Sequence, residues 1–136
     1  MTTITEDYVS FETAKLLKDK GFNEYLSTYY DEDTLIQESI IRRDWNNDKF
    51  VANCITAPTL QMAMKWLREE HNIIVIVEPH VFNPQAGRAT QFSFSVWVED
   101  NYVDPYFDDP EHQFESFSTY EKTCDVAIKY CLTNLV

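Results

Sequence analysis

The stretch from Thr56 to Val77 constrains the fold more than any other part of the sequence. It reads TAPTLQMAMKWLREEHNIIVIV and joins an amphipathic helix to an apolar strand with almost no linker. Pro58 favours a helix start, because proline has no N–H to leave unpaired and its φ is already helical. Either Thr56 or Thr59 can accept a hydrogen bond from the free amides of the first turn. The stretch therefore predicts a helix followed at once by a buried strand.

The apolar residues of this helix recur at helical spacing. Four of them fall at i, i+3, i+4 and i+7 and form one stripe: Leu60, Ala63, Met64 and Leu67. Met62 and Trp66 add a second, offset pair. The helix ends at His71-Asn72, since asparagine tolerates the left-handed conformation of a C-terminal cap. Residues 73–77 follow without alternation, which is typical of a strand covered on both faces. We therefore expect Trp66 and Leu67 to be largely buried.

Helix signals also mark both ends of the chain. Ser10 can cap a helix over residues 11–20, and Gly21-Phe22 ends it, with glycine in the left-handed position. Ser118-Thr119-Tyr120-Glu121 has the pattern of a capping box, with the serine as the cap. The helix that follows reaches about Asn134. Its apolar stripe consists of Tyr120, Cys124, Ala127, Ile128, Cys131, Leu132 and Leu135.

Strand signals fill the intervals between these helices. Residues 26–43 suggest a hairpin with an acidic turn at 31–33, and residues 49–55 suggest a short strand, although the pairing of strands within 26–55 stays open. Residues 78–88 read as a turn-rich connection. Residues 90–98 alternate strictly, with the apolar set Thr90, Phe92, Phe94, Val96 and Val98 on one face. We expect this strand to pair with residues 73–77, and residues 114–117 to add a short edge strand.

Together these signals predict one α+β domain over residues 1–136. The expected order is a helix, two strands with an optional third, a helix, two strands with an optional third, and a last helix. We expect a two-layer domain with a mostly antiparallel sheet and with the central and C-terminal helices packed on one of its faces. The composition suits such a core, since 44% of residues are apolar and 15% are aromatic.

Two blocks of the sequence resemble a known group of proteins. APTLQMAMKWLREEHNIIVIV at 57–77 and STYEKTCDVAIKYCLTNLV at 118–136 are similar to blocks in small uncharacterised proteins of gut bacteria and their phages, and FETAKLLKDKGF at 11–22 resembles the opening helix of that group. The three blocks cover about two fifths of the chain. Residues 26–50 and 99–117 do not align with the group. The resemblance implies an α+β fold and a phage or mobile-element context, and no catalytic residues.

Charge and composition exclude several classes of function. The net charge of −12 argues against direct nucleic-acid binding, because phosphate recognition needs a basic face. Two glycines are too few for a phosphate-cradling loop. No apolar run approaches the length of a membrane span, and MTTITEDYVS lacks the basic and apolar regions of a signal peptide. We therefore expect a cytoplasmic protein without membrane association.

The three cysteines fit that compartment. Cys54, Cys124 and Cys131 are odd in number and form no CxxC pair. Cys124 and Cys131 lie seven residues apart on one predicted helix, about 10.5 Å by helix rise, which is too far for a disulfide. A nucleophilic role is the alternative to burial as small apolar side chains. We expect burial, and hence reduced thiols that react slowly.

No catalytic motif stands out. The histidines are His71, His80 and His112, and none has the spacing of HExxH or of a related ligand motif. His71 suits a cation at a helix end. His80 and His112 are expected in loops, where they could meet acidic residues and bind a small ligand or a metal. The acidic run 31–33 lacks the spacing of a calcium loop. We predict no catalytic residue, no metal ligand and no cofactor, and the sequence favours a protein that is not an enzyme.

Residues 99–117 are the compositional anomaly of the chain. They contain seven acidic residues and no lysine or arginine, with aromatic residues interleaved. Exposed aromatic side chains beside acids supply the anchors and the charged rim of a protein interface. The predicted binding residues are Trp97, Asp100, Tyr102, Asp104, Tyr106, Phe107, Asp108 and Asp109, with a basic patch on the partner. In the competing interpretation, the aromatics fold back over the open face of the sheet and the acids are merely solvated.

Three functions therefore remain as hypotheses. The favoured one is a non-enzymatic protein-interaction or accessory module of phage or mobile-element origin. The second is a nucleic-acid mimic that inhibits a basic host protein, which the charge supports without deciding. The third is a small-ligand or metal site built from His80, His112 and nearby acids.

Overall fold

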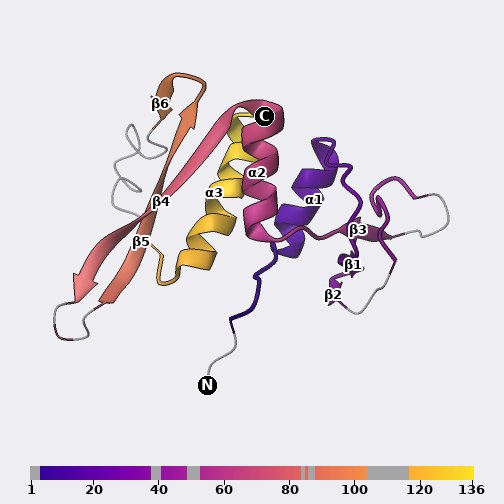
Figure 1. The fold of residues 1–136 in the computed structure, drawn as a ribbon, viewed down its shortest axis with the longest axis horizontal. Coiled ribbons are helices and arrows are strands. Elements are labelled where there is room, and N and C mark those ends of the chain that lie inside the picture. Colours follow the sequence, from indigo (N-terminus) through magenta and orange to yellow (C-terminus); the bar gives the residue numbers. More distant parts are fainter. Residues whose placement is uncertain (1–3, 38–40, 49–52, 84, 86–87, 104–116) are drawn as a thin grey trace. The chain divides into compact units, whose positions relative to one another are not determined.

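The computed structural model describes residues 4–37, 41–48, 53–83, 85, 88–103 and 117–136 (Figure 1). Along these residues the elements follow in the order α1 (Phe11–Asp19), β1 (Tyr29–Asp31), β2 (Thr34–Ile36), β3 (Cys54–Thr56), α2 (Leu60–His71), β4 (Ile73–Asn83), β5 (Arg88–Val98), β6 (Asn101–Val103) and α3 (Tyr120–Asn134). The strands form two antiparallel sheets, with strand orders β2-β1-β3 and β4-β5-β6. The predicted α+β class is confirmed. The first optional strand, predicted at 49–55, is present in part as β3, whereas β6 was not predicted and most of the second optional strand, predicted at 114–117, lies outside the described residues. The chain divides into two compact units, residues 1–63 with Val136 and residues 64–135.

In the first unit, α1 begins and ends where its local chemistry requires. The Ser10 hydroxyl accepts a hydrogen bond from the Thr13 amide at 3.2 Å. Gly21 has a φ of +92°, and the Phe22 amide reaches back to the Leu17 carbonyl at 2.9 Å. This is the Schellman end of a helix, in which a left-handed residue lets two amides satisfy orphan carbonyls. The predicted helix and its ends are confirmed.

The sheet of the first unit answers the pairing question that the sequence left open. β1 pairs with β2 on one edge and with β3 on the other, and Asp31 lies opposite both Thr34 and Cys54. Tyr30, at the centre, is buried, and its hydroxyl donates to the Val9 carbonyl at 2.7 Å. The Phe11 ring meets the Tyr30 ring edge-on at 5.4 Å. The predicted hairpin and its acidic turn are present, with strands of only three residues each.

The start of α2 confirms one of the two predicted caps and corrects the role of Pro58. Thr59 is the cap, because its hydroxyl accepts from the Met62 amide at 3.1 Å. Pro58 therefore precedes the cap instead of opening the first turn. Thr56 does not cap the helix: it is the last residue of β3, and its amide donates to the Asn46 side-chain oxygen at 2.9 Å. At the far end, Asn72 has a φ of +55°, as expected for an asparagine cap.

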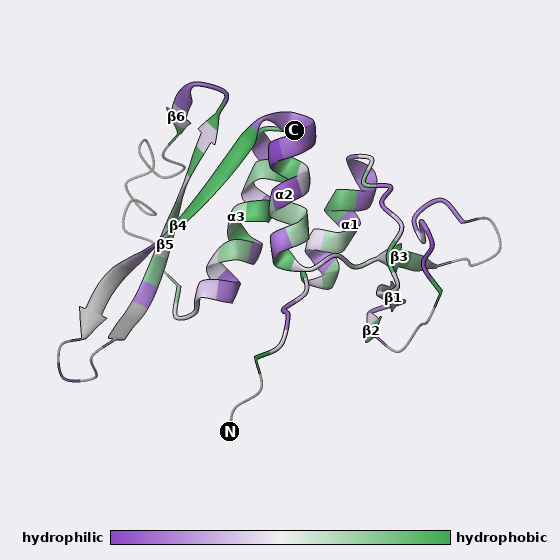
Figure 2. Ribbon diagram, viewed as in Figure 1, coloured by the Kyte–Doolittle hydropathy of each residue, from purple (hydrophilic) through white to green (hydrophobic). Residues whose placement is uncertain are grey.

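The second unit is a three-stranded sheet with α3 on one face. α3 contacts β4 and β5. The Tyr130 ring lies 5.9 Å from the Phe94 ring, and Tyr120 meets Phe92 edge-on at 6.1 Å. Phe94 and Val96, which share the apolar face of the alternating strand, are buried. In Figure 2 the inner parts of β4 and α3 are hydrophobic, whereas the turn between β5 and β6 is hydrophilic.

The β4–β5 pairing is confirmed and longer than predicted. Ile73 lies opposite Val98, and the pairing continues to Asn83 opposite Arg88, with register shifts on both sides of Val81. The residues predicted as a loop at 78–83 are therefore strand, including Pro79 and His80. Residues 114–116 of the predicted edge strand lie outside the described residues. Phe117, however, forms an isolated bridge to Phe92, with two hydrogen bonds of 2.8 Å.

The start of α3 also corrects a prediction. Thr119 caps the helix and its hydroxyl accepts from the Lys122 amide at 3.1 Å, so Ser118 lies one residue before the cap. Most of the predicted stripe is buried, namely Cys124, Ala127, Ile128, Cys131 and Leu132, whereas Tyr120 is exposed. Trp66 and Leu67 of α2 are buried as predicted, and Met62 is exposed. None of the helices in the described part of the chain has the length and apolar character that crossing a bilayer requires.

Candidate functional site

Three large apolar side chains form a row across the second sheet. Ile74 lies directly opposite Trp97, and Trp97 lies directly opposite Tyr102, so the register places one of them on each strand. They are 46%, 37% and 56% exposed, respectively. The rings of Trp97 and Tyr102 meet edge-on, with centroids 5.5 Å apart. We call Ile74, Trp97 and Tyr102 the apolar row.

The apolar row lies on the sheet face opposite α3. Successive residues of a strand point to opposite faces, so Trp97 and its neighbour Val96 face in opposite directions. Val96 shares its face with Phe94, which contacts Tyr130 of α3. We call the other face, on which Ile74, Trp97 and Tyr102 are exposed, the open face. Single exposed apolar residues are common on proteins, but directly adjacent ones in register make a continuous patch.

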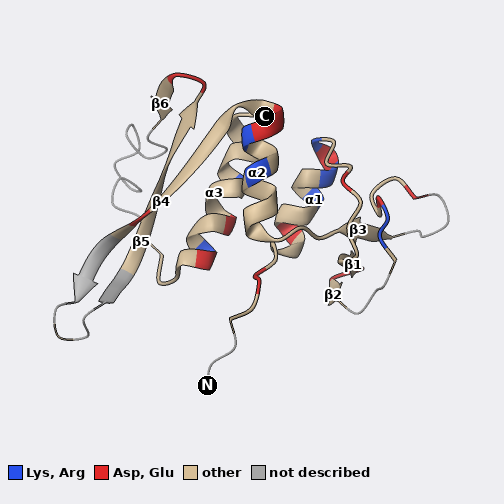
Figure 3. Cartoon of the chain, viewed as in Figure 1, with Lys and Arg blue, Asp and Glu red and all other residues tan. Residues whose placement is uncertain are grey.

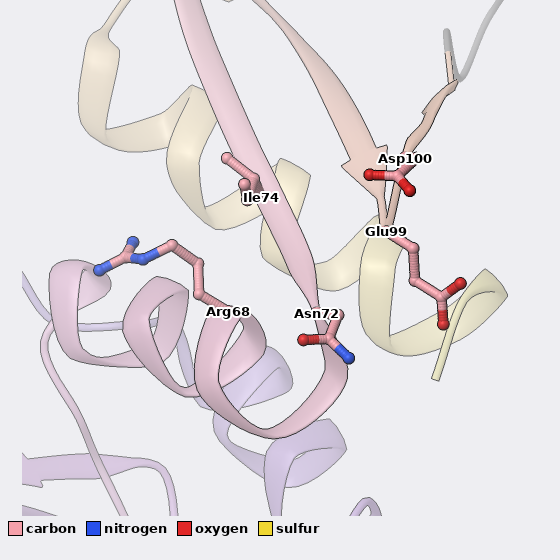
Figure 4. A pocket seen from close by; sticks show the side chains of 5 residues that line it. All are labelled: Arg68, Asn72, Ile74, Glu99 and Asp100. Atoms are coloured by element: carbon pink, nitrogen blue, oxygen red, sulfur yellow. The ribbon is translucent and has the colours of Figure 1, made fainter.

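An open depression of about 380 Å³ adjoins the apolar row at Ile74. It is lined by Arg68, Asn72, Ile74, Glu99 and Asp100. Figure 4 shows Ile74 in front of β4, with Arg68 from the last turn of α2 on one side and Asp100 from the β5–β6 turn on the other. The depression therefore combines an apolar floor with one cation and two carboxylates. Among the described residues that line it, none is a serine, cysteine or histidine that could act as a nucleophile or base.

Two left-handed residues fix the backbone around this depression. Asn72 and Glu99 each have a φ of +55°, and the Glu99 amide donates to the Asn72 carbonyl at 3.0 Å. This bond ties the start of β4 to the end of β5. The loop between β5 and β6 consists only of Glu99 and Asp100, because Val98 pairs with Asn101. Two exposed acidic residues are thus held on a tight turn beside the apolar row, and Figure 3 shows this turn in red.

The structure brings together the described members of the predicted binding site. Trp97 and Tyr102 are in contact, and Asp100 lies in the turn that joins their strands. The other predicted members, Asp104, Tyr106, Phe107, Asp108 and Asp109, lie outside the described residues. The segment that contains them leaves β6 after Val103, which pairs with Val96, and rejoins β5 at Phe117, which pairs with Phe92. Both of its ends are therefore attached to the same edge of β5.

Sequence reasoning missed Ile74 and Arg68. The unbroken apolar run 73–77 predicted a strand covered on both faces, and the exposure of Ile74 shows that this prediction is wrong for the open face. The pairing of Ile74 with Trp97 was the available signal, because residues opposite each other in an antiparallel pair share a face. Arg68 gave no signal, since an exposed arginine near a helix end is common.

The histidines do not assemble a site in the described residues. His80 lies in β4 instead of a loop, which corrects the prediction, and His112 lies outside the described residues. The His71 ring packs edge-on against Trp66 at 4.7 Å. Over the described ranges, no group of three or more His, Cys, Asp or Glu side chains is placed to hold a metal ion.

The cysteines are buried, as the sequence predicted. All three are free thiols. Burial raises the pKa of the Cys124 thiol to about 11 and that of the Cys131 thiol to about 12. Burial, and then the nearby carboxylates of Asp31 and Asp48, also raise the pKa of Cys54. Because the thiolate is the reactive form, these pKa values disfavour nucleophilic roles.

Comparison with protein-family models, with curated proteins and with solved structures gives no match. The site offers an exposed aromatic and aliphatic surface with charged groups beside it, which suits contact with another macromolecule better than chemistry on a small substrate.

Proposed function

We propose that this chain is a non-enzymatic protein-interaction module that docks a partner with a basic patch on the open face of its second sheet. The apolar row is the observation that carries the proposal. Tryptophan and tyrosine are the residues that most often dominate binding energy at protein interfaces, and here they touch and extend into Ile74. An apolar centre beside charged residues is the usual arrangement of such an interface.

The charge distribution supports a basic partner. Glu99 and Asp100 lie beside the apolar row in the β5–β6 turn, and the segment 99–117 contains seven acidic residues without a lysine or arginine. Like charges collected in one segment repel each other, and a stable domain has no structural need to collect them. A partner with lysines or arginines around an apolar centre relieves this repulsion. Complementary charge of this kind also speeds association.

The proposed setting rests on the thiols and on the sequence. We propose a cytoplasmic setting because the three cysteines are buried free thiols, which suit a reducing compartment, and a phage or mobile-element origin on the resemblance of the helix blocks. The proposed module binds its partner without a cofactor and without direct contact to nucleic acid.

The first experiment removes the aromatic anchors. The double variant Trp97→Ser/Tyr102→Ser is compared with Tyr25→Ser, which removes a 63% exposed tyrosine of the first unit. A partner is isolated on the immobilised wild-type protein and purified, and its affinity for each variant is measured by calorimetry. Loss of two anchors should weaken binding at least about tenfold. Tyr25→Ser should bind like the wild type. Equal affinity of the double variant would remove the apolar row from the interface.

The second experiment neutralises the acidic segment. Asp104, Asp108 and Asp109 are changed to Asn, and association rates are measured from low to high salt. For an interface, association slows and its salt dependence flattens, because screened attraction no longer steers the encounter. If the segment is only solvated surface, the partner is kept with full affinity at low salt. A partner that double-stranded DNA displaces would instead support the nucleic-acid mimic.

A further inference from the structure

At the outer edge of β4, every second residue directs its backbone N–H and C=O groups away from the sheet, where no described strand pairs with them. β4 is an edge strand of the β4-β5-β6 sheet, and β5 is its only partner among the described strands. The Glu99 amide donates to the Asn72 carbonyl, so the backbone groups of residue 72 point toward β5. Because the direction reverses at each residue, Ile74, Ile76 and Glu78 also bond to β5. Val75 and Val77 therefore direct their N–H and C=O groups away from the sheet.

Two independent observations agree with this assignment. Phe92 exchanges backbone hydrogen bonds with Phe117. The N–H and C=O groups of even-numbered residues of β5 therefore point away from β4, and those of odd-numbered residues point toward it. Phe92 pairs with Pro79. Proline cannot donate to a ladder, and within a sheet it is placed with its nitrogen on the free side of an edge strand. Pro79 is odd-numbered, like Val75 and Val77, so the backbone groups of all three lie on the free side of β4.

The edge is protected in one half and open in the other. Natural sheets block free edges with prolines, bulges and charged residues, because an open edge is a template for another strand. In β4 such devices begin at Glu78, with Pro79 next and register shifts on both sides of Val81. Residues 73–77 have neither charge, proline nor register shift. We call residues 73–77 the open edge.

We infer that an extended, basic peptide segment of a partner protein binds by adding as a fourth strand to the open edge. This inference rests on the proposed function and supplies its binding mode. An added strand would place alternate side chains beside Ile74, Ile76 and Glu78 on the open face. Apolar side chains there would extend the apolar row, and a lysine or arginine would meet Glu78. Backbone hydrogen bonds give such complexes affinity, and alternate side chains give them specificity.

Charge identifies the occupant. Glu78 is exposed on the open face of β4 and Glu99 and Asp100 are exposed in the β5–β6 turn, whereas Arg68, the one cation among the described residues that line the depression, flanks Ile74 on the side away from Asp100 (Figure 4). A second copy of this chain would bring a further net charge of −12 to the same edge. Repulsion between two such copies disfavours edge-to-edge pairing of this protein with itself, whereas a basic segment is attracted.

The test uses a short peptide whose sequence reads the same in both directions. The blocked peptide Lys-Thr-Val-Thr-Val-Thr-Lys presents valines and terminal lysines on one face, whichever way it runs. Amide hydrogen exchange is followed residue by residue by NMR on the full chain. At saturation, exchange at Val75 and Val77 should slow by about tenfold or more, while Ile74 and Ile76, already in the ladder, should not change. This alternation is the signature of strand addition.

Matched controls separate the edge from the face. The same peptide with N-methylated threonines and valines cannot form a ladder. A peptide in which glutamates replace the two terminal lysines has the wrong charge. Neither should protect Val75 or Val77. Val75→Pro removes an outward N–H and leaves the β5 ladder intact, so it should fold and lose peptide binding. Glu78→Lys leaves the backbone unchanged and should weaken binding of the Lys-ended peptide several-fold at low salt.

Four outcomes would overturn the inference. Peptide effects confined to Trp97 and Tyr102, and kept in Val75→Pro, would mean docking on the open face without strand addition, and would leave the proposed function standing. Protection of Val75 and Val77 without peptide would mean that the edge is already covered, by a second copy if the chain sediments as a dimer and by its own residues otherwise. Equal binding of the N-methylated peptide would exclude a ladder. No binding at millimolar peptide would exclude the site.

Discussion

Trp97 and Tyr102 lie directly opposite each other on β5 and β6, with ring centroids 5.5 Å apart and ring planes at 69°. Edge-to-face pairs of this kind contribute about 0.5–1.5 kcal/mol beyond the burial of area. Because both rings are exposed, the pair needs no surrounding core to form. In the free protein it therefore favours the ring arrangement that the apolar row presents to a partner.

The coupling between these rings is measurable in the free protein. A double-mutant cycle with Trp97→Ala and Tyr102→Ala should give an interaction free energy of about 0.5–1 kcal/mol, read from urea unfolding. Trp97→Ala with Tyr120→Ala is the control cycle, since Tyr120 contacts Phe92 instead. An interaction below about 0.2 kcal/mol would show that the two rings do not meet in solution.

Leu67 and Met62 give a matched test of the α2 stripe. Leu67 is 0% exposed and Met62 is 38% exposed, although both are large apolar residues of one helix. Leu67→Ala should lower the free energy of unfolding by about 2–5 kcal/mol, because it removes a fully buried side chain and leaves a cavity. Met62→Ala should lower it by less than about 1 kcal/mol. Chemical denaturation measures both. A loss below about 0.5 kcal/mol for Leu67→Ala would contradict the buried stripe.

The sequence predicted local structure correctly where one residue type determines the backbone conformation. Gly21 and Asn72 take left-handed conformations at the ends of α1 and α2, as their residue types predicted. Strict alternation in β5 predicted which side chains are buried, and Phe94 and Val96 are. These signals are short in range and do not depend on what packs against the segment.

The sequence did not predict the features that depend on contacts between distant segments, namely which strand faces are covered and how short strands pair. β4 is aliphatic on both faces, so its pattern could not show that α3 covers only one of them and leaves Ile74 exposed. Strands of three residues, such as β1 and β3, are too short to carry a period, and their pairing had to come from the structure. Of the site, Trp97, Asp100 and Tyr102 were predicted. Ile74 was recognised as part of the site only from its pairing with Trp97 in the structure.

The choice between Ser118 and Thr119 as the cap of α3 shows the same limit. Both residues can cap a helix, and the pattern with Glu121 favoured Ser118. Phe117, however, is held against Phe92 by two backbone hydrogen bonds, and the Thr119 hydroxyl is the one that accepts from the Lys122 amide. Thr119→Ala should therefore lower the free energy of unfolding by about 1 kcal/mol, and Ser118→Ala should leave it within about 0.5 kcal/mol. Thermal or urea unfolding of the two variants decides, and the reverse order would restore the cap that the sequence suggested.

The buried thiols make stability depend on alkaline pH. Burial raises the pKa of Cys124 to about 11 and that of Cys131 to about 12, whereas an unfolded cysteine titrates near pH 8.5. The folded state therefore holds these protons more tightly than the unfolded state. The resulting stabilisation is fully present below pH 8.5 and is lost as the pH rises toward the folded pKa values. Each thiol should lower the free energy of unfolding by about 1.4 kcal/mol per pH unit within that window.

Cys131→Ala isolates one thiol from the tyrosines and lysines that ionise in the same range. The difference in unfolding free energy between the wild type and this variant should be constant below pH 8.5. Above it the difference should shrink by about 1.4 kcal/mol per pH unit, measured by urea unfolding up to pH 10.5. Thiol labelling of the native wild type should first reach Cys54, which is 9% exposed, and leave the fully buried Cys124 and Cys131 unmodified until the chain unfolds. Rapid labelling of Cys131 at neutral pH, or a pH-independent difference, would show that this thiol is not buried in the native state.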